Sequence, residues 1–327
     1  MLHYYCKFRV TEMPNVAGKA LRFASAVLSV SLGLGCGVIK LAAQTPVCSA
    51  QQEDACLALV KAAVANEVAA NDDPSKHMFR SRKQSGQNSQ TRLYVETREA
   101  MVGMTIAYDD KPLSPEQLRG EEDRLAGIAN SPEQLKHKHA QEEENAEHTL
   151  RIVKALPDAF LYEYDGKVEG SMGLGHPGAQ LVRLKFHPNP AYQPPSHVEE
   201  VLVGMAGIVI VDPTQHRIAL IDGTLSKEVS FGWGILGHLD KGGHFLVQQC
   251  NAGGNTWEIS RMSLSFTGKI LIFKKLAIHS DEVFSDFRMV PSDTTFAQGV
   301  QILKTEEVKL AQNGIAEAVK PTGEGGH

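Results

Sequence analysis

The most regular pattern of the chain lies between residues 204 and 290, where apolar and aromatic residues alternate with polar or small ones. This period of two predicts β-strands, because successive side chains of a strand point to opposite faces of its sheet. The turns between the predicted strands are short, as at Asp212-Pro213 and at residues 240–243. Parallel neighbours would need crossovers of about a dozen residues or more. We therefore predict an antiparallel meander.

Residues 229–235 combine large and small positions within this meander. The large residues share one face, namely Val229, Phe231, Trp233 and Ile235. The opposite face carries only serine and glycine. A row of small residues behind a row of bulky ones predicts one strand that either bends strongly or lets another group approach its small face closely.

Further along, the alternation changes its phase. Trp257 and Ile259 share a face, whereas Met262, Leu264 and Phe266 have the opposite parity. One extra residue in the strand restores a common face, so the sequence predicts a β-bulge between Ile259 and Met262. Glycine-containing turn sequences predict strand ends at residues 222–223 and 267–269.

The first half of the chain predicts a helix and further strands. Apolar residues at spacings of three and four predict a helix over residues 51–71. Strands are expected at residues 91–97 and 101–108, and again at 159–164, where Asp165-Gly166 supplies a turn.

Between these strands lies a predicted helical insertion, residues 114–156. The same start signal occurs twice, as Ser114-Pro115-Glu116-Gln117 and as Ser131-Pro132-Glu133-Gln134. Serine serves as N-cap, proline takes the first helical position, and glutamine completes the capping box. Pro157 is expected to end the second helix. Because residues 136–147 are mostly charged or polar, we predict that the insertion projects from the sheet and is separable from it.

The first fifty residues have the features of an export signal. Basic residues precede an apolar run from Phe23 to Gly35, and small residues at positions 42–43 and 49–50 offer cleavage sites. A membrane anchor is the alternative, but the run is short and Lys40 interrupts it. The chain is thus predicted to be periplasmic or otherwise exported after signal-peptide cleavage. Cys36 lacks the leucine that normally stands three residues before a lipidated cysteine, so a lipid-anchored form is not expected.

Composition bounds the body of the protein. With 327 residues, of which 42% are hydrophobic and 22% charged, the chain can bury a sizeable core. Its formal charge of -5, without a basic stripe, argues against nucleic acid as a partner.

Cys56 and Cys250 either pair in an oxidising compartment or leave Cys250 as a buried free thiol.

The predicted fold class is α+β, with a strongly curved antiparallel sheet (an unclosed barrel) packed by helices and a protruding helical insertion. The predicted domains are a signal peptide over residues 1–50, a single curved-sheet domain over 51–303 that includes the insertion 114–156, and a flexible C-terminal tail over 304–327.

Candidate chemistry is sparse. His238, Asp240 and His244 bracket one hairpin turn, and histidine with carboxylate could ligate zinc. The turn itself explains Asp240, however, and no neighbouring glutamate or cysteine in the sequence completes a site, so we predict no metal. The motifs G-x-S-x-G and H-E-x-x-H do not occur. The sequence therefore predicts a protein without a cofactor that is not an enzyme.

The order of elements resembles the periplasmic lipoprotein carriers of the LolA and LppX-like fold, from a leading helix through strands and an insertion to a long meander. Residues 131–164, 188–196 and 237–243 also resemble a group of uncharacterised exported bacterial proteins, which implies no activity. The carrier resemblance implies an unclosed barrel, plugged by helices, that holds acyl chains on its concave face. The charged second helix of the insertion is longer than that family usually carries.

Two functions follow from these patterns. In the first, an exported protein binds a lipid, a lipoprotein acyl chain or another apolar ligand in the concave face, lined by Phe231, Trp233, Ile235, Phe245, Trp257 and Phe273. A chain of about fourteen carbons would gain on the order of 10 kcal/mol, at ~0.8 kcal/mol per methylene. In the second, these residues are ordinary core, and the protein is a non-enzymatic envelope component that meets an envelope protein partner through its charged helical arm.

Overall fold

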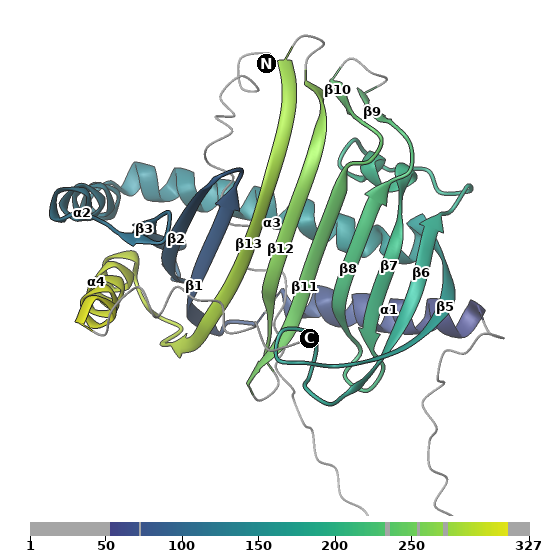
Figure 1. Cartoon of the computed structure of the whole chain (residues 1–327), viewed down its shortest axis with the longest axis horizontal. Helices are drawn as coiled ribbons and strands as arrows, with labels where there is room; N and C mark the ends of the chain where they lie inside the picture. The colour runs from purple at the N-terminus through teal and green to yellow at the C-terminus, as the bar shows by residue number, and fades with distance from the viewer. Residues whose placement is uncertain (1–52, 72, 233–235, 254–255, 271–273, 313–327) are drawn as a thin grey trace, which may run out of the picture. The chain divides into compact units, whose positions relative to one another are not determined.

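The structure, a computed structural model, describes residues 53–71, 73–232, 236–253, 256–270 and 274–312 (Figure 1). These residues fall into two compact units, which we describe separately. Unit 1 comprises residues 74–151 and 282–312, and unit 2 comprises the described residues from 53 to 73 and from 152 to 281. The sequence predicted one curved-sheet domain over 51–303.

Unit 1 combines strands with three helices. Its strands are β1 (Lys76–Ser85), β2 (Asn88–Val95), β3 (Val102–Tyr108), β4 (Lys111–Pro112) and the second half of β13 (Lys274–Val290). Its helices are α2 (Pro115–Ala129), most of α3 (Pro132–Ala159) and α4 (Phe296–Gln312). The basic, polar residues after Arg80 belong to regular strands. They continue β1 to Ser85 and enter β2 at Asn88.

Helices α2 and α4 cover one face of β2 and β3. Alternate strand residues such as Val95, Val102 and Met104 form a buried cluster with Leu125 of α2 and with α4. The capping box at Ser114 is present, with Gln117 donating to the serine hydroxyl and accepting from the Ser114 backbone. Since Leu125 is only 1% exposed, α2 is part of this core. This burial argues against the expectation that the α2 part of the insertion is separable.

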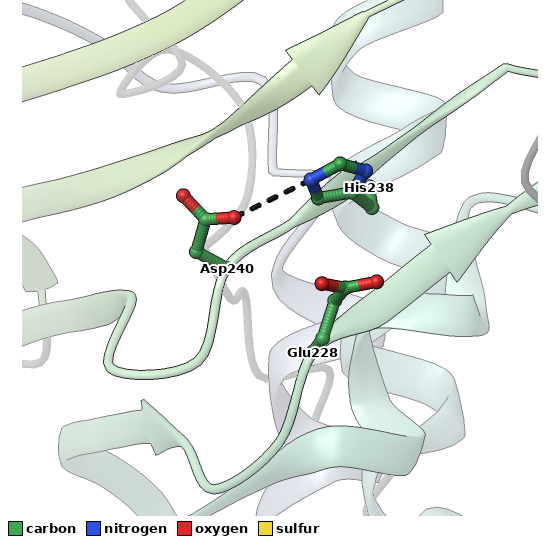
Figure 2. A group of neighbouring side chains, drawn as sticks. All are labelled: Glu228, His238 and Asp240. Atoms are coloured by element: carbon green, nitrogen blue, oxygen red, sulfur yellow. Dashed lines mark ion pairs between the residues drawn. The ribbon is translucent and has the colours of Figure 1, made fainter. Parts of the chain in front are cut away.

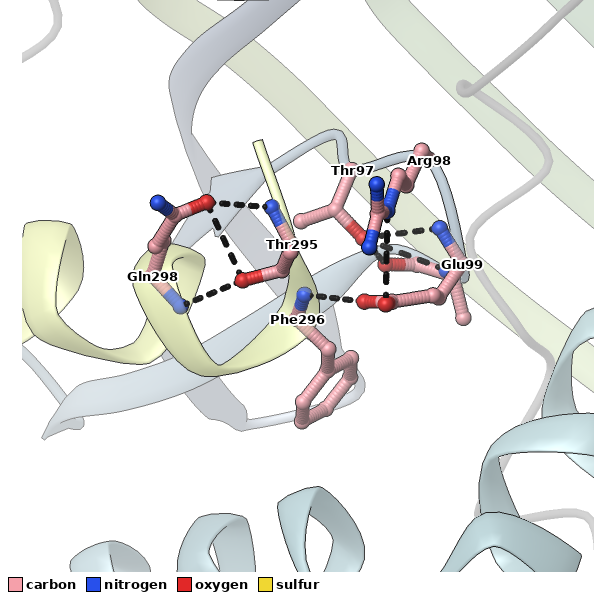
Figure 3. Close-up of polar contacts among 7 residues, drawn as sticks. Thr97, Arg98, Glu99, Thr295, Phe296 and Gln298 are labelled. Atoms are coloured by element: carbon pink, nitrogen blue, oxygen red, sulfur yellow. Dashed lines mark hydrogen bonds and ion pairs between the residues drawn. The ribbon is translucent and has the colours of Figure 1, made fainter. Parts of the chain in front are cut away.

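The start of α4 is fixed by side chains from two segments of unit 1 (Figure 3). Thr295 and Gln298 cap the helix reciprocally, with N–H···O distances of 2.8 and 3.2 Å. The carboxylate of Glu99 accepts a hydrogen bond from the backbone N–H of Phe296. A negative charge at a helix N-terminus is favourable. The predicted flexible tail from residue 304 is therefore wrong as far as Gln312, where α4 ends.

Unit 2 holds the larger set of strands. In chain order its elements are α1 (Glu53–Ala70), the end of α3, β5 (Phe160–Glu169), β6 (Gln180–Pro188), the 3₁₀-helix η3 (Glu199–Gly204), β7 (Met205–Asp212), β8 (Arg217–Leu225), β9 (Val229–Phe231), β10 (Gly237–Leu239), β11 (His244–Gly253), β12 (Thr256–Ile270) and the first half of β13. The helix predicted over 51–71 is confirmed as α1.

The strands pair antiparallel in the order β4-β3-β2-β1-β13-β12-β11-β8-β7-β6-β5, and β10 joins β12 to β9. Among the described residues this sheet has thirteen strands and does not close into a barrel. The predicted fold class, α+β with an unclosed antiparallel sheet, is confirmed.

Two apolar clusters form the core of unit 2. In the first, α1 packs on β5, β7 and β8 through residues such as Val60 and Ala63. In the second, Leu181, Ile210, Leu220 and Trp257 pack with residues of the loop 170–179. Residues opposite each other in the register, such as Ile210 and Leu220, belong to the same cluster.

Three predicted strand ends are wrong because the strands run through them. β8 passes Gly223, β12 passes residues 267–269, and β5 passes Asp165-Gly166 with an irregularity in its pairing. At Gly223, a β-carbon would lie 2.7 Å from the sulfur of Met205. This glycine therefore makes room for a neighbouring side chain within the sheet.

The strand predicted over residues 229–235 is also wrong at Gly232, whereas residues 233–235 lie outside the described part of the chain. β9 ends at Phe231, where Gly232 adopts a positive φ of 55°. β10 then pairs back on β9, with Gly237 opposite Phe231 and Leu239 opposite Val229. A short hairpin replaces the single bent strand.

The β-bulge predicted in β12 is confirmed. Gln248 of β11 pairs with Arg261, but the next residue, Gln249, pairs with Ile259. Ser260 is the extra residue, and it allows Ile259 and Met262 to share a face.

Pro157 does not end α3, which continues to Ala159. The carbonyls of this last turn have other partners, since Asn189 donates to those of Asp158 and Ala159 and Tyr162 donates to that of Leu156. These hydrogen bonds offset the one that proline removes.

Candidate apolar ligand-binding face

Alternate residues of β11 and β12 form a continuous apolar surface on unit 2. Phe245 and Val247 of β11 lie opposite Leu264 and Met262 of β12, and opposite residues of paired strands share a face. Phe266 continues the β12 row by alternation. All five side chains are half-buried, so part of each stays accessible. We call these five residues the β11–β12 face.

This face belongs to the side of the sheet on which α1 lies. Phe245 pairs with Gly223 and Val247 with Ile221, and Ile221, Phe245 and Phe266 all pack against the α1 cluster. The helix itself contacts β5, β7 and β8. Moving across the sheet from β8 to β12, the same side thus changes from a fully buried core to a half-buried apolar surface.

The structure brings together only some of the predicted ligand-binding residues. Phe231 and Phe245 are both half-buried at the edge of the α1 cluster. Trp233, Ile235 and Phe273 lie outside the described residues. Trp257 is 1% exposed and belongs to the second cluster. Its predicted place beside Phe245 is therefore wrong.

Trp257 is held by polar and cationic neighbours of its own. Its indole N–H donates to Oε1 of Gln215 at 2.6 Å, and the Arg217 guanidinium lies 5.5 Å from the ring centroid. A tryptophan with a satisfied N–H and a covered ring is a core residue rather than a binding surface.

The β11–β12 face includes residues that sequence reasoning did not assign to the site. Met262, Leu264 and Val247 join Phe245 through the pairing register of β11 with β12. The common parity of Met262, Leu264 and Phe266 was visible in the sequence. It could be used only once the pairing register with β11 was known.

The two cysteines of the described residues differ in state. Cys56 of α1 is disulfide-bonded, and Cys250 of β11 is free and buried. The bridge considered between Cys56 and Cys250 is therefore absent, and the free thiol at Cys250 is confirmed. Burial, together with the nearby Glu258 carboxylate, raises the pKa of the Cys250 thiol, which makes it a poor nucleophile.

A separate polar cluster lies at the β9–β10 hairpin (Figure 2). Glu228, His238 and Asp240 each offer a ligand atom, and these atoms lie within 4.8 Å of one another. His244, which the sequence grouped with His238, instead pairs with Asp222 at 2.8 Å. The expectation that no nearby glutamate completes the group is wrong, because the hairpin brings Glu228 beside Asp240.

The fold and the β11–β12 face define a class: an α+β protein with an open antiparallel sheet, one side of which is partly covered by a helix and partly presents apolar side chains. Comparison with known protein families, curated proteins and solved structures finds no match for this chain. The resemblance to lipoprotein carriers thus stays a prediction. No helix among the described residues has the length and apolar character needed to cross a membrane.

Proposed function

We propose that this chain is an exported, non-enzymatic binding protein that holds a lipid or another apolar ligand against the β11–β12 face. One observation carries the proposal: five large apolar side chains on paired strands form one surface that is only half-buried. A filled core would cover such side chains fully. Contiguous apolar surface that remains accessible is typical of a ligand or partner site.

The chemistry of this surface favours an aliphatic ligand. Phe245, Val247, Met262, Leu264 and Phe266 offer no charge and no side-chain hydrogen bond, apart from the weak acceptor sulfur of methionine. An acyl chain is matched to such a surface because its binding needs no directional partner, only contact that removes methylene groups from water.

The proposed export of the protein has support of its own. Cys56 is disulfide-bonded, and disulfides persist mainly in oxidising compartments such as the periplasm. Together with the signal-like pattern of the first fifty residues, this supports a periplasmic or otherwise exported location. N-terminal sequencing of the protein from cells should begin near Gln44 rather than Gln51, because a chain that starts at Gln51 keeps only Cys56 and the free Cys250 and has no partner for the Cys56 disulfide. An intact Met1 or Met13 form in the cytosol would contradict export.

The test of ligand binding is native mass spectrometry of protein purified without detergent, followed by organic extraction and analysis of the extract. A binding protein should retain an apolar molecule in stoichiometric amount, or take up a fluorescent fatty acid after delipidation.

A chain that retains nothing and takes up no fatty acid would overturn the proposal. The remaining interpretation is then an envelope structural protein that acts through the charged surface of α3, where Lys138 and Glu142 form an ion pair on the helix surface.

A further inference from the structure

The β9–β10 hairpin has one apolar face and one face made of metal-ligand residues. Val229, Phe231 and Leu239 point toward the α1 cluster, and Val229 is 3% exposed. The alternate positions belong to the other face, where His238 lies opposite Ser230. Continuing this register by one residue sets Asp240 opposite Glu228. Glu228, His238 and Asp240 therefore share one face of a two-stranded ribbon (Figure 2).

The distances within this group suit a single small cation. Nε2 of His238 lies 3.4 Å from Oδ1 of Asp240, and all three ligand atoms are within 4.8 Å of one another. Ligands bound about 2.0–2.1 Å from a tetrahedral ion lie roughly 3.4 Å apart. The His238–Asp240 pair already has that spacing, and Glu228 needs only a side-chain adjustment at an exposed position.

Two hydrogen bonds with Thr267 fix the position of Asp240. The hydroxyl of Thr267 donates to Oδ2 of Asp240 at 2.7 Å, and the backbone N–H of Asp240 donates to the carbonyl of Thr267 at 2.9 Å. Oδ1, the atom nearer His238, is thereby oriented toward the group. Hydrogen bonds that orient a ligating carboxylate in this way are common in metal sites.

The hairpin can approach β12 only because residue 268 is glycine. A β-carbon on Gly268 would lie 2.1 Å from the carbonyl oxygen of His238. Lys269, its neighbour, lies opposite His238 in the register and is exposed. Because opposite residues of paired strands share a face, Lys269 lies on the face of His238, where its positive charge disfavours a bound cation. Lys227 and Lys241 flank the same hairpin.

We propose that Glu228, His238 and Asp240 bind one divalent transition-metal ion of the Zn²⁺ type, with the remaining coordination position open to water. One imidazole with two carboxylates matches the mixed N and O donors that Zn²⁺ accepts, whereas Mg²⁺ and Ca²⁺ prefer oxygen ligands alone. Two carboxylates also balance the charge of the ion. The site is independent of ligand binding at the β11–β12 face.

The experiment is equilibrium dialysis of the whole chain against Zn²⁺, with metal content measured by mass spectrometry, and a parallel titration with Co²⁺ followed by visible absorbance. The variants are His238→Ala, Glu228→Gln and Asp240→Asn. The matched control is His244→Ala, which removes a histidine that pairs with one carboxylate, Asp222, at 2.8 Å. Circular dichroism checks that each variant is folded.

We expect one Zn²⁺ whose affinity falls at least about tenfold in each of the three variants, because loss of even a residue that only orients a ligand typically costs about 10–100-fold, and stays unchanged in His244→Ala. Lys269→Ala should bind at least as tightly as the wild type, because it removes this positive charge. The proposal is overturned if the wild type binds no more Zn²⁺ than a variant that combines all three substitutions, or if His244→Ala loses as much affinity as His238→Ala.

Discussion

Arg217 of β8 forms a two-pronged ion pair with Glu67 of α1 inside unit 2. Its Nε lies 3.1 Å from Oε1 of Glu67 and its Nη2 lies 3.3 Å from Oε2, and both side chains are almost fully buried. The same carboxylate accepts the backbone N–H of Ile218 at 2.9 Å. This pair joins the helix to the sheet beside Trp257, over whose ring Arg217 lies.

Arg217→Met should destabilise unit 2 strongly, because it leaves the Glu67 carboxyl buried without its cation. Breaking one side of a buried pair typically costs about 3–5 kcal/mol of unfolding free energy. The control is Arg261→Met, which breaks the exposed pair with Asp281 (2.8 Å) and should cost at most about 1 kcal/mol. Urea unfolding followed by tryptophan fluorescence measures both. Equal losses would contradict a structural role for the buried pair.

The Glu67 carboxyl should also make stability depend on pH. Burial, which outweighs the opposing effect of Arg217, raises its pKa from 4.5 to about 7. Between pH 4.5 and about 7, the folded state therefore binds more protons than the unfolded state. The stability that protonated Glu67 contributes is complete below pH 4.5 and is lost as the pH rises through about 7. Glu67→Gln should flatten the fall in unfolding free energy over this window. Parallel pH profiles for the two proteins would show that the carboxyl does not titrate there.

Local signals in the sequence were the ones that predicted structure correctly. The capping box at Ser114 depends on residues three positions apart, and the bulge at Ser260 is visible as a change of parity along one strand. Asp222-Gly223 was misjudged because the same glycine that suits a turn also suits a site beneath the Met205 side chain. Only the packed sheet distinguishes these two uses.

The candidate sites depended on pairing between strands, which the sequence does not display. Glu228 meets Asp240 because the β9–β10 hairpin reverses the chain between Phe231 and Gly237. A continuous strand through residue 235 would have kept them far apart. In the same way, Met262 joins Phe245 only through the β11–β12 register.

Leu125 should prove essential to unit 1, although it lies in the predicted insertion. It is 1% exposed and packs in one cluster with β3 and α4. Leu125→Ala should cost about 2–5 kcal/mol, the usual range for a buried leucine. Leu118→Ala, at a half-buried position on the same helix, is the control and should cost clearly less. A negligible effect of Leu125→Ala in chemical unfolding would restore the view that the insertion is separable.

The N-terminal cap of α4 allows a test of unit 1 with a smaller expected loss of stability. Glu99→Ala removes the carboxylate that accepts from the backbone N–H of Phe296, and should lower the unfolding free energy by about 1–2 kcal/mol. Glu99→Gln keeps an acceptor oxygen and loses only the charge, so its cost should be smaller. Hydrogen exchange at the first turn of α4 should report the same ranking. If Glu99→Gln lowers the unfolding free energy as much as Glu99→Ala, the charge of the carboxylate matters and the hydrogen bond does not.

Met262→Glu should abolish retention of an apolar ligand while leaving the fold intact. Met262 is half-buried, so a glutamate there can keep its charge in contact with water, but the charge stands in the middle of the β11–β12 face. An acyl chain covering that face would have to desolvate the carboxylate, which is strongly unfavourable. The control is Ser263→Glu, because the next residue of a strand points to the opposite side.

Trp257→Glu is the control for loss of stability, since it places a charge at a 1% exposed core position and should unfold unit 2. Fluorescent fatty acid titration and thermal unfolding measured on all three variants separate binding from stability. If Met262→Glu lowers the unfolding temperature as much as Trp257→Glu, the β11–β12 face is ordinary core. If it remains folded and binds as tightly as Ser263→Glu, the ligand does not lie on this face.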